Sequence, residues 1–206
     1  MPELTTVLTD YALAALAVLL AGRLFRSASP LPEARRLWVA AFLLSALGAF
    51  LGGTWHAVSP GAVVSRRHLW SATYLVLGLA NLAFLAGAVR AVVPSPRRTA
   101  AFALLGVRFV VYAVWLLLLR QVRLVVADFA LSLLLLLAFA LYCLFTKREG
   151  TGGWLLAGTL VSAAGAAVLA SGRSPFSGFN HNDWFHVIQM GGTWLFYRAG
   201  LRLQDR

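Results

Sequence analysis

Cysteine, lysine and acidic residues are nearly missing from this 206-residue sequence. Cys143 is the one cysteine, so no intrachain disulfide can form. Charged residues make up 12% of the chain, and only 7 of them are Asp or Glu, whereas soluble domains carry roughly a quarter charged residues. These shortages exclude a disulfide-stapled fold and an ordinary soluble domain.

Apolar residues and arginine dominate what is present. Hydrophobic residues account for 60% of the chain, and the mean hydropathy is +0.78, which indicates an integral membrane protein. The net charge of +11 does not indicate a nucleic-acid partner, because the arginines stand singly or in pairs between apolar runs and form no basic face. Membrane lipid is the partner that this composition favours.

The apolar runs predict an all-α fold of seven transmembrane helices in a single domain, residues 1–206. Each run reaches or nearly reaches the roughly 20 residues that a helix needs to cross about 30 Å of hydrocarbon. Proline and glycine cluster in the gaps, where they end helices. We expect helices over Thr5–Leu24, Leu37–Ala57, Leu69–Val92, Thr99–Leu119, Leu124–Phe145, Trp154–Ala170 and Trp184–Leu201.

The basic residues predict the orientation of these helices. Alternate loops divide them into 12 on one side and 5 on the other, and the remaining one, Arg108, falls inside a span. The positive-inside rule then places the N-terminus outside and the C-terminus in the cytoplasm. Arginine greatly outnumbers lysine in a sequence rich in alanine and leucine, which favours a bacterial inner membrane.

Four histidines carry the functional signal. His56 ends the second predicted helix, His68 opens the third, and His181 and His186 lead into the seventh, so all four fall at the non-cytoplasmic face. Polar groups at a membrane boundary are costly unless they bind one another or a ligand. Three imidazoles and a water complete a zinc site, so we expect His56, His181 and His186 to hold zinc.

The polar residues of the seventh helix admit several roles. We expect this helix to begin near Asp183, with Asn182 or Asp183 as its N-cap and His181 on a loop folded over it. Three roles are open for Asp183: it ligates the metal, it orients a histidine, or it only caps the helix. Gln189 lies three residues after His186 and therefore on the same helical face.

Arg108 lies near the middle of the fourth span, about 18 Å from Arg120 at 1.5 Å per residue. An intramembrane arginine needs a partner, a cavity or a lipid phosphate. Asp128 and Asp10 are the candidate partners, and contact with a substrate head group is the alternative.

The tetrapeptide Gly-Gly-Thr-Trp occurs twice, at 52–55 and 191–194. Small residues let transmembrane helices approach closely. One interpretation is that the second and seventh helices meet at these glycines; the other is coincidence in a sequence rich in glycine and tryptophan.

The pattern resembles the superfamily of alkaline ceramidases and progestin-and-adipoQ receptors, seven-helix membrane hydrolases. Thr54 and His56 resemble that superfamily's small polar residue and histidine at the end of helix two. Phe185-His186-Val187-Ile188 resembles the second of its two helix-seven histidines, although Asn182 stands four residues earlier, where the first would be. His68 stands near the start of helix three, where the superfamily has an acid.

The resemblance implies a zinc-dependent hydrolase that acts on a lipid amide or ester at the outer membrane boundary. Metal-bound water would be the nucleophile, and Asp183, His68 and Thr54 would be the catalytic residues. Arg108 and Gln189 would contact substrate. Two alternatives stay open: a non-catalytic protein that binds haem or a metal ion through the same histidines, and a structural seven-helix bundle. The oligomeric state is not predicted.

Overall fold

The computed structural model describes residues 3–146, 150–174 and 178–206, and in these residues the chain is all-α, as predicted. Seven helices follow one another along the chain. They are α1 (Leu4–Phe25), α2 (Glu33–Ala57), α3 (Val63–Val92), α4 (Ser95–Leu119), α5 (Val122–Phe145), α6 (Thr151–Ser171) and α7 (His181–Gly200).

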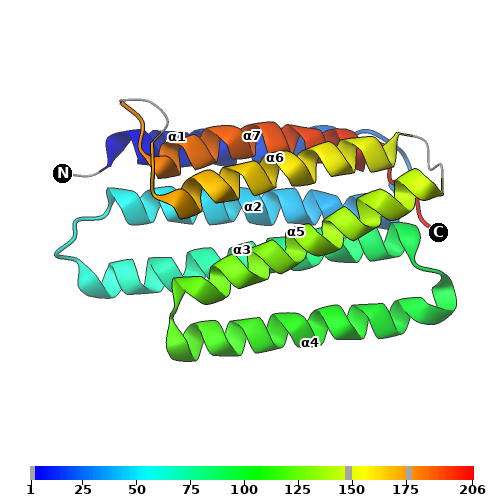
Figure 1. Ribbon diagram of the computed structural model, residues 1–206, viewed down its shortest axis with the longest axis horizontal. Helices are drawn as coiled ribbons and strands as arrows, with labels where there is room; N and C mark the ends of the chain where they lie inside the picture. The colour runs from blue at the N-terminus through cyan, green and yellow to red at the C-terminus, as the bar shows by residue number, and fades with distance from the viewer. Residues whose placement is uncertain (1–2, 147–149, 175–177) are drawn as a thin grey trace.

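Six helices, α1 to α6, are long and apolar enough to cross a membrane, which identifies a multi-pass membrane protein. Helix α7 spans 20 residues but falls outside this set within the described chain. Its first two turns carry His181, Asp183 and His186, which lower its mean hydropathy. It nevertheless runs alongside α1 and α6 in the bundle (Figure 1).

Six of the helices form a closed ring, in the order α1, α2, α3, α5, α6, α7 and back to α1. Helix α4 packs on α3 and α5 and lies outside the ring (Figure 1). Most of its surface faces outward, because only Leu105, Tyr112 and Leu116 are buried. The turn from α4 to α5 is tight, with only Arg120 and Gln121 between the helices, and Arg120 adopts a left-handed conformation there (φ 49°).

Aromatic side chains pack together inside the ring of helices. The indole of Trp38 packs edge-on against Phe84 at a centroid distance of 5.1 Å and against Phe196 at 6.2 Å. The indole nitrogen donates to the Phe84 carbonyl oxygen at 3.0 Å. Gly87 makes room for the indole, because a Cβ atom at Gly87 would lie 2.3 Å from Trp38 Cδ1. This glycine is required by the close approach of α3 to α2.

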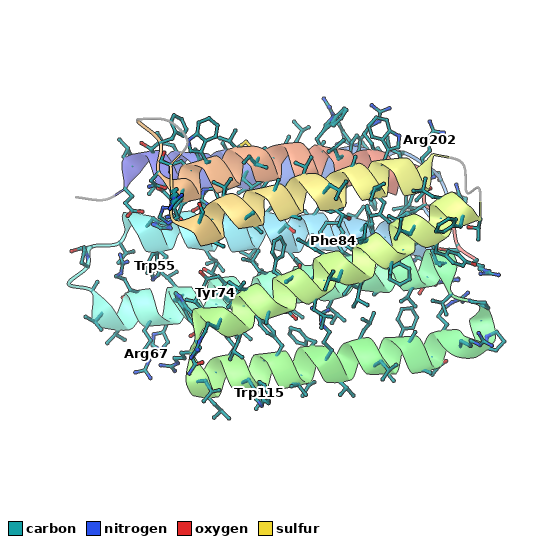
Figure 2. All side chains as sticks on the ribbon, viewed as in Figure 1. Trp55, Arg67, Tyr74, Phe84, Trp115 and Arg202 are labelled. Carbon is teal, nitrogen blue, oxygen red and sulfur yellow. The ribbon has the colours of Figure 1, made fainter. Side chains whose placement is uncertain are left out.

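The two ends of the bundle differ in chemistry. The histidine end holds the C-terminus of α2 and the N-termini of α1, α3 and α7, and all four histidines lie there, as predicted. The opposite end, the arginine end, holds Arg35 on α2, Arg90 on α3 and Arg202 after α7. Figure 2 labels Trp55 and Arg67 at the first end and Arg202 at the second.

Asp205 closes the arginine end by capping α2. Its two carboxylate oxygens accept hydrogen bonds from the backbone N–H groups of Glu33 (3.0 Å) and Ala34 (2.9 Å). Partial burial opposes the charged carboxylate, but these N–H groups and nearby Arg90 outweigh it and hold the pKa of Asp205 below its usual value. The chain after α7 is thereby fixed to the start of α2.

The repeated Gly-Gly-Thr-Trp segments do not meet. Gly53 faces α1, where an added Cβ atom would lie 2.8 Å from the ring of Tyr11. Gly192 faces α6, where an added Cβ atom would lie 2.5 Å from Ser162 Oγ. The interpretation that α2 and α7 pack through these glycines is wrong, because the two segments face different helices, α1 and α6.

Candidate acid–base site at the histidine end

The candidate site forms where α1 lies between α2 and α7. Thr6 and Asp10 share one face of α1, four residues apart, and are buried. Asp183 and His186 share one face of α7, three residues apart, and are also buried. Their exposed fractions are 5% for Asp10, 1% for Asp183 and 8% for His186. Ionisable groups this deeply buried are stable only with close polar partners.

His186 links a hydroxyl to a carboxylate. Its Nδ1 lies 3.0 Å from Thr9 Oγ1, and its Nε2 lies 3.2 Å from Asp10 Oδ1. Thr9 Oγ1 also lies 3.0 Å from the Thr6 carbonyl oxygen. A hydroxyl that is hydrogen-bonded to an imidazole, whose second nitrogen meets a carboxylate, has the connectivity of an activated nucleophile. We call these three side chains the Thr9–His186–Asp10 relay.

The position of the Thr9 hydroxyl hydrogen decides which nitrogen of His186 is protonated. When that hydrogen points to the Thr6 carbonyl oxygen, Nδ1 must carry a proton in order to donate to Thr9 Oγ1. When it points to Nδ1 and the imidazole is neutral, the ring proton is on Nε2, which faces Asp10 Oδ1 at 3.2 Å. This second form, with Asp10 as a carboxylate, is the base form of the relay.

Asp183 serves as a structural clamp beside the relay. Its Oδ1 accepts the Thr6 hydroxyl at 2.7 Å, and its Oδ2 accepts the backbone N–H of Asn180 at 2.9 Å. The side chain of Asn180 in turn accepts from the backbone N–H groups of Asn182 and Asp183, which completes a capping box. Asp183 therefore caps α7 and joins it to α1.

The capping box corrects the predicted start of the seventh helix. Asn180 is the N-cap, and α7 begins at His181, whereas the sequence analysis placed the N-cap at Asn182 or Asp183. The predicted loop position of His181 is wrong for the same reason. Asp183 at the third helical position returns a hydrogen bond to the cap, so the helix starts earlier than hydropathy indicates.

His56 approaches the relay from α2. Its Nδ1 lies 3.0 Å from Glu3 Oε2, and its ring lies edge-on to Trp55 at 4.8 Å. Gly52, one turn before His56, faces Asp10, since a Cβ atom there would lie 3.5 Å from Asp10 Oδ2, an ordinary van der Waals distance.

Three other predicted site residues, His68, His181 and Thr54, make none of the contacts that form the relay. His68 is exposed on α3, and His181 is half-buried at the first position of α7. Thr54 donates to the Phe50 carbonyl oxygen at 2.8 Å, and its hydroxyl also lies 3.2 Å from that of Tyr11.

Gln189 faces α6, where its Nε2 donates to Ser162 Oγ at 3.2 Å. Its Oε1 is buried and has no partner within the part of the chain that the structure describes. The helical spacing from His186 is as predicted, but this contact directs the carboxamide toward α6.

Arg108 pairs with Asp128, one of its two predicted partners. Its Nη2 donates to Asp128 Oδ1 at 2.5 Å and to Ser132 Oγ at 2.6 Å. Asn81 donates to the second oxygen of Asp128 at 2.9 Å. This network joins α3, α4 and α5, which favours a structural salt bridge over contact with a substrate.

The predicted zinc ligands do not form a three-ligand set. Within residues 3–146, 150–174 and 178–206, no group of three His, Cys, Asp or Glu side chains is arranged to hold a metal ion. His186 uses both ring nitrogens for Thr9 and Asp10, and His56 uses Nδ1 for Glu3. A metal ion bound to His186 would have to displace one of these contacts.

Thr6 and Thr9 were not predicted as site residues, and Asp10 was named only as a candidate partner of Arg108, whereas it pairs with His186. The signal was present: Thr6, Thr9 and Asp10 lie at helical spacing on one face of an otherwise apolar segment. Their partners are on α7, more than 170 residues away along the chain, and no local pattern identifies such a pair.

Comparison with known proteins places the chain by family. A family model described as DUF6962, a family of unknown function, matches residues 5–205. The chain belongs to this family. No curated protein and no solved structure matches it. The match covers all seven helices, so the relay and the arginine end both lie within the family's shared region.

Proposed function

We propose that the protein is a membrane-embedded hydrolase that cleaves a lipid amide or ester at the histidine end. The single observation that carries this proposal is the buried relay of hydroxyl, imidazole and carboxylate contributed by α1 and α7. The surrounding apolar bundle favours a substrate with acyl chains, because such a substrate reaches the site through the membrane.

In the proposed reaction, the base form of the relay removes the proton of Thr9. Oγ1 attacks the carbonyl carbon of the substrate while its proton moves to Nδ1 of His186, and the imidazolium is stabilised by the Asp10 carboxylate. The imidazolium then gives this proton to the leaving amine or alcohol. Water hydrolyses the resulting acyl ester of Thr9, with His186 again taking and returning one proton.

The zinc ion implied by the ceramidase resemblance is a separate part of the proposal. His56 and His186 would be its nearest histidine ligands, and it would supply a polarised carbonyl or an activated water. No step above depends on it. Elemental mass spectrometry of untagged protein tests it: near-stoichiometric zinc that is lost in His56→Ala supports the ion, and its absence from both proteins contradicts it.

We further propose that α7 is a seventh span and that the histidine end faces outward, with the C-terminus in the cytoplasm. The imbalance of arginine between the two ends supports this orientation through the positive-inside rule. A bacterial inner membrane fits the same pattern. Accessibility labelling of single cysteines introduced at Arg67 and Arg202 in intact cells tests it, since only the first should react from outside.

Paired variants of Thr9 test the chemistry. Purified protein in lipid nanodiscs is incubated with a panel of lipid amides and esters, and released fatty acid is measured by mass spectrometry. Thr9→Val should abolish release, and Thr9→Ser should retain it, because serine keeps the hydroxyl. Equal activity in Thr9→Val and wild type would exclude Thr9 as the nucleophile.

A further inference from the structure

A polar pocket lies at the arginine end, at the opposite end of the bundle from the relay. It has a volume of about 400 Å³ and is lined by residues of α2, α3, α5, α6 and the segment that follows α7. Small-molecule sites occupy about 300–1,000 Å³. The polar side chains that line it are Arg35, Thr151, Arg202 and Gln204.

Arg35 is a buried cation without a counter-charge. Only 6% of its surface is exposed. Its Nε donates to the Leu203 carbonyl oxygen at 2.8 Å, and its Nη1 donates to Ser27 Oγ at 3.3 Å. Among the described residues no carboxylate lies within ion-pair distance of it, and no acceptor meets Nη2.

The acidic side chains described at this end are already engaged. Glu33 Oε2 accepts from Arg90 Nε at 2.6 Å, and Asp205 caps α2 and lies 3.6 Å from Arg90. A buried guanidinium whose charge is left unpaired is costly, so an anion supplied from outside the chain would stabilise it.

The first turn of α6 adds donors to the same pocket. Thr151 is the first residue of α6, and the cap before it is Gly150 in a left-handed conformation (φ 71°), which has no side chain to accept the free N–H groups. Arg202 lies over this turn, because a Cβ atom at Gly150 would be 4.0 Å from its Cγ and Nε. Helix N-termini and arginine forks together bind phosphate oxygens.

We propose that this pocket binds a phosphate-type anion, held by Arg35, Arg202, Thr151 and the N-terminus of α6. A tetrahedral phosphate accepts hydrogen bonds from several directions, which matches donors on separate elements around one space. The anion is either the phosphate of a lipid head group at this membrane boundary or a free phosphate from solution. The site is distinct from the relay and does not depend on the proposed hydrolysis.

Binding assays with two phosphate sources test the proposal. Protein in nanodiscs of neutral lipid is titrated calorimetrically with inorganic phosphate. Separately, protein in detergent is mixed with phosphatidylglycerol or with phosphatidylcholine, and retained lipid is counted by native mass spectrometry. Arg202→Gln is the main variant because Arg202 is exposed, and Arg97→Gln is the matched control, an exposed arginine at the same end outside the pocket.

We expect wild type to bind at least one phosphate source, Arg202→Gln to bind it at least tenfold more weakly, and Arg97→Gln to stay within twofold of wild type. Binding of inorganic phosphate assigns the site to a soluble anion, and selective retention of phosphatidylglycerol alone assigns it to a head group. Absence of binding in wild type, or equal losses in Arg202→Gln and Arg97→Gln, would overturn the proposal. Arg35→Lys should weaken binding similarly while keeping a charge near Leu203, provided that its unfolding midpoint matches wild type.

Discussion

Replacing Asp183 by alanine should destabilise the protein through the clamp between α1 and α7. Asp183 is 1% exposed, and each of its oxygens accepts one hydrogen bond, from the Thr6 hydroxyl at 2.7 Å and from the Asn180 backbone at 2.9 Å. Alanine would leave the buried Thr6 hydroxyl and the half-buried N–H of Asn180 without that acceptor. Loss of the second of these two bonds breaks the capping box of α7.

The magnitude follows from the two lost interactions. Loss of a cap costs about 1 kcal/mol, and loss of a hydrogen bond to a charged group costs about 1.5–3 kcal/mol. We therefore expect Asp183→Ala to lower the free energy of unfolding by roughly 2.5–4 kcal/mol. This is a large share of the 5–15 kcal/mol, approximately, that stabilises a typical folded protein.

Reversible unfolding by sodium dodecyl sulfate in mixed micelles, followed by circular dichroism, measures this change. Asn182→Ala is the matched control, since it makes the same truncation in the same turn. Asp183→Asn separates structure from catalysis, because its carbonyl oxygen still accepts from Asn180. Neutral surface changes alter the free energy of unfolding by less than about 0.5 kcal/mol. A loss of stability below that value in Asp183→Ala would refute the clamp. A stable but inactive Asp183→Asn would instead support the catalytic role that the sequence predicted.

Three further predictions concern packing, the buried ion pair and pH. Gly87→Ala should cost about 1–3 kcal/mol, because the new methyl group meets Trp38 at 2.3 Å; Gly106→Ala, with open space at its Cβ position, should be neutral or stabilising in the same unfolding assay. Arg108→Ala leaves its carboxylate partner on α5 unpaired and should cost about 3–5 kcal/mol, so an unfolding midpoint equal to that of wild type would contradict the ion pair. The folded-state pKa of Asp205 is lowered, so its contribution to stability is present above its unfolded pKa of about 3.9 and is lost as pH falls through the folded value. The stability difference between wild type and Asp205→Asn should accordingly be constant near neutral pH and shrink toward pH 3, and a difference independent of pH would be inconsistent with this capping role.

Hydropathy predicted the order of the seven helices in the described chain, six of which are long and apolar enough to span a membrane, but it did not predict their polar ends. The third helix begins at Val63 rather than Leu69, because the polar residues Ser65 to His68 interrupt the apolar run after its first two valines. Arg66 explains why this turn is ordered: it donates to the carbonyl oxygens of Trp55 and Val58 at the end of α2. Such contacts depend on tertiary structure and leave no periodic pattern.

The sequence predicted at which end of the bundle the candidate site lies but not which residues form it. Histidine spacing correctly indicated that one end of the bundle concentrates imidazole. The partner of His186 could not be inferred, because periodicity gives the face of a helix and not its neighbour in the bundle. Once α1 is known to lie between α2 and α7, Asp10 becomes the partner of His186 and is no longer available to Arg108.

The most direct test of hydrolysis by the relay is a comparison of His186→Gln with wild type in nanodiscs. The quantity measured is the rate of fatty-acid release from lipid amides and esters. General acid–base groups contribute about 10²–10⁴-fold to rates, so His186→Gln should lose at least about a hundredfold in rate. Arg67→Gln, an exposed change at the same end, should retain the wild-type rate. Release by His186→Gln at the wild-type rate, or no release by wild type from any lipid amide or ester, would contradict the account.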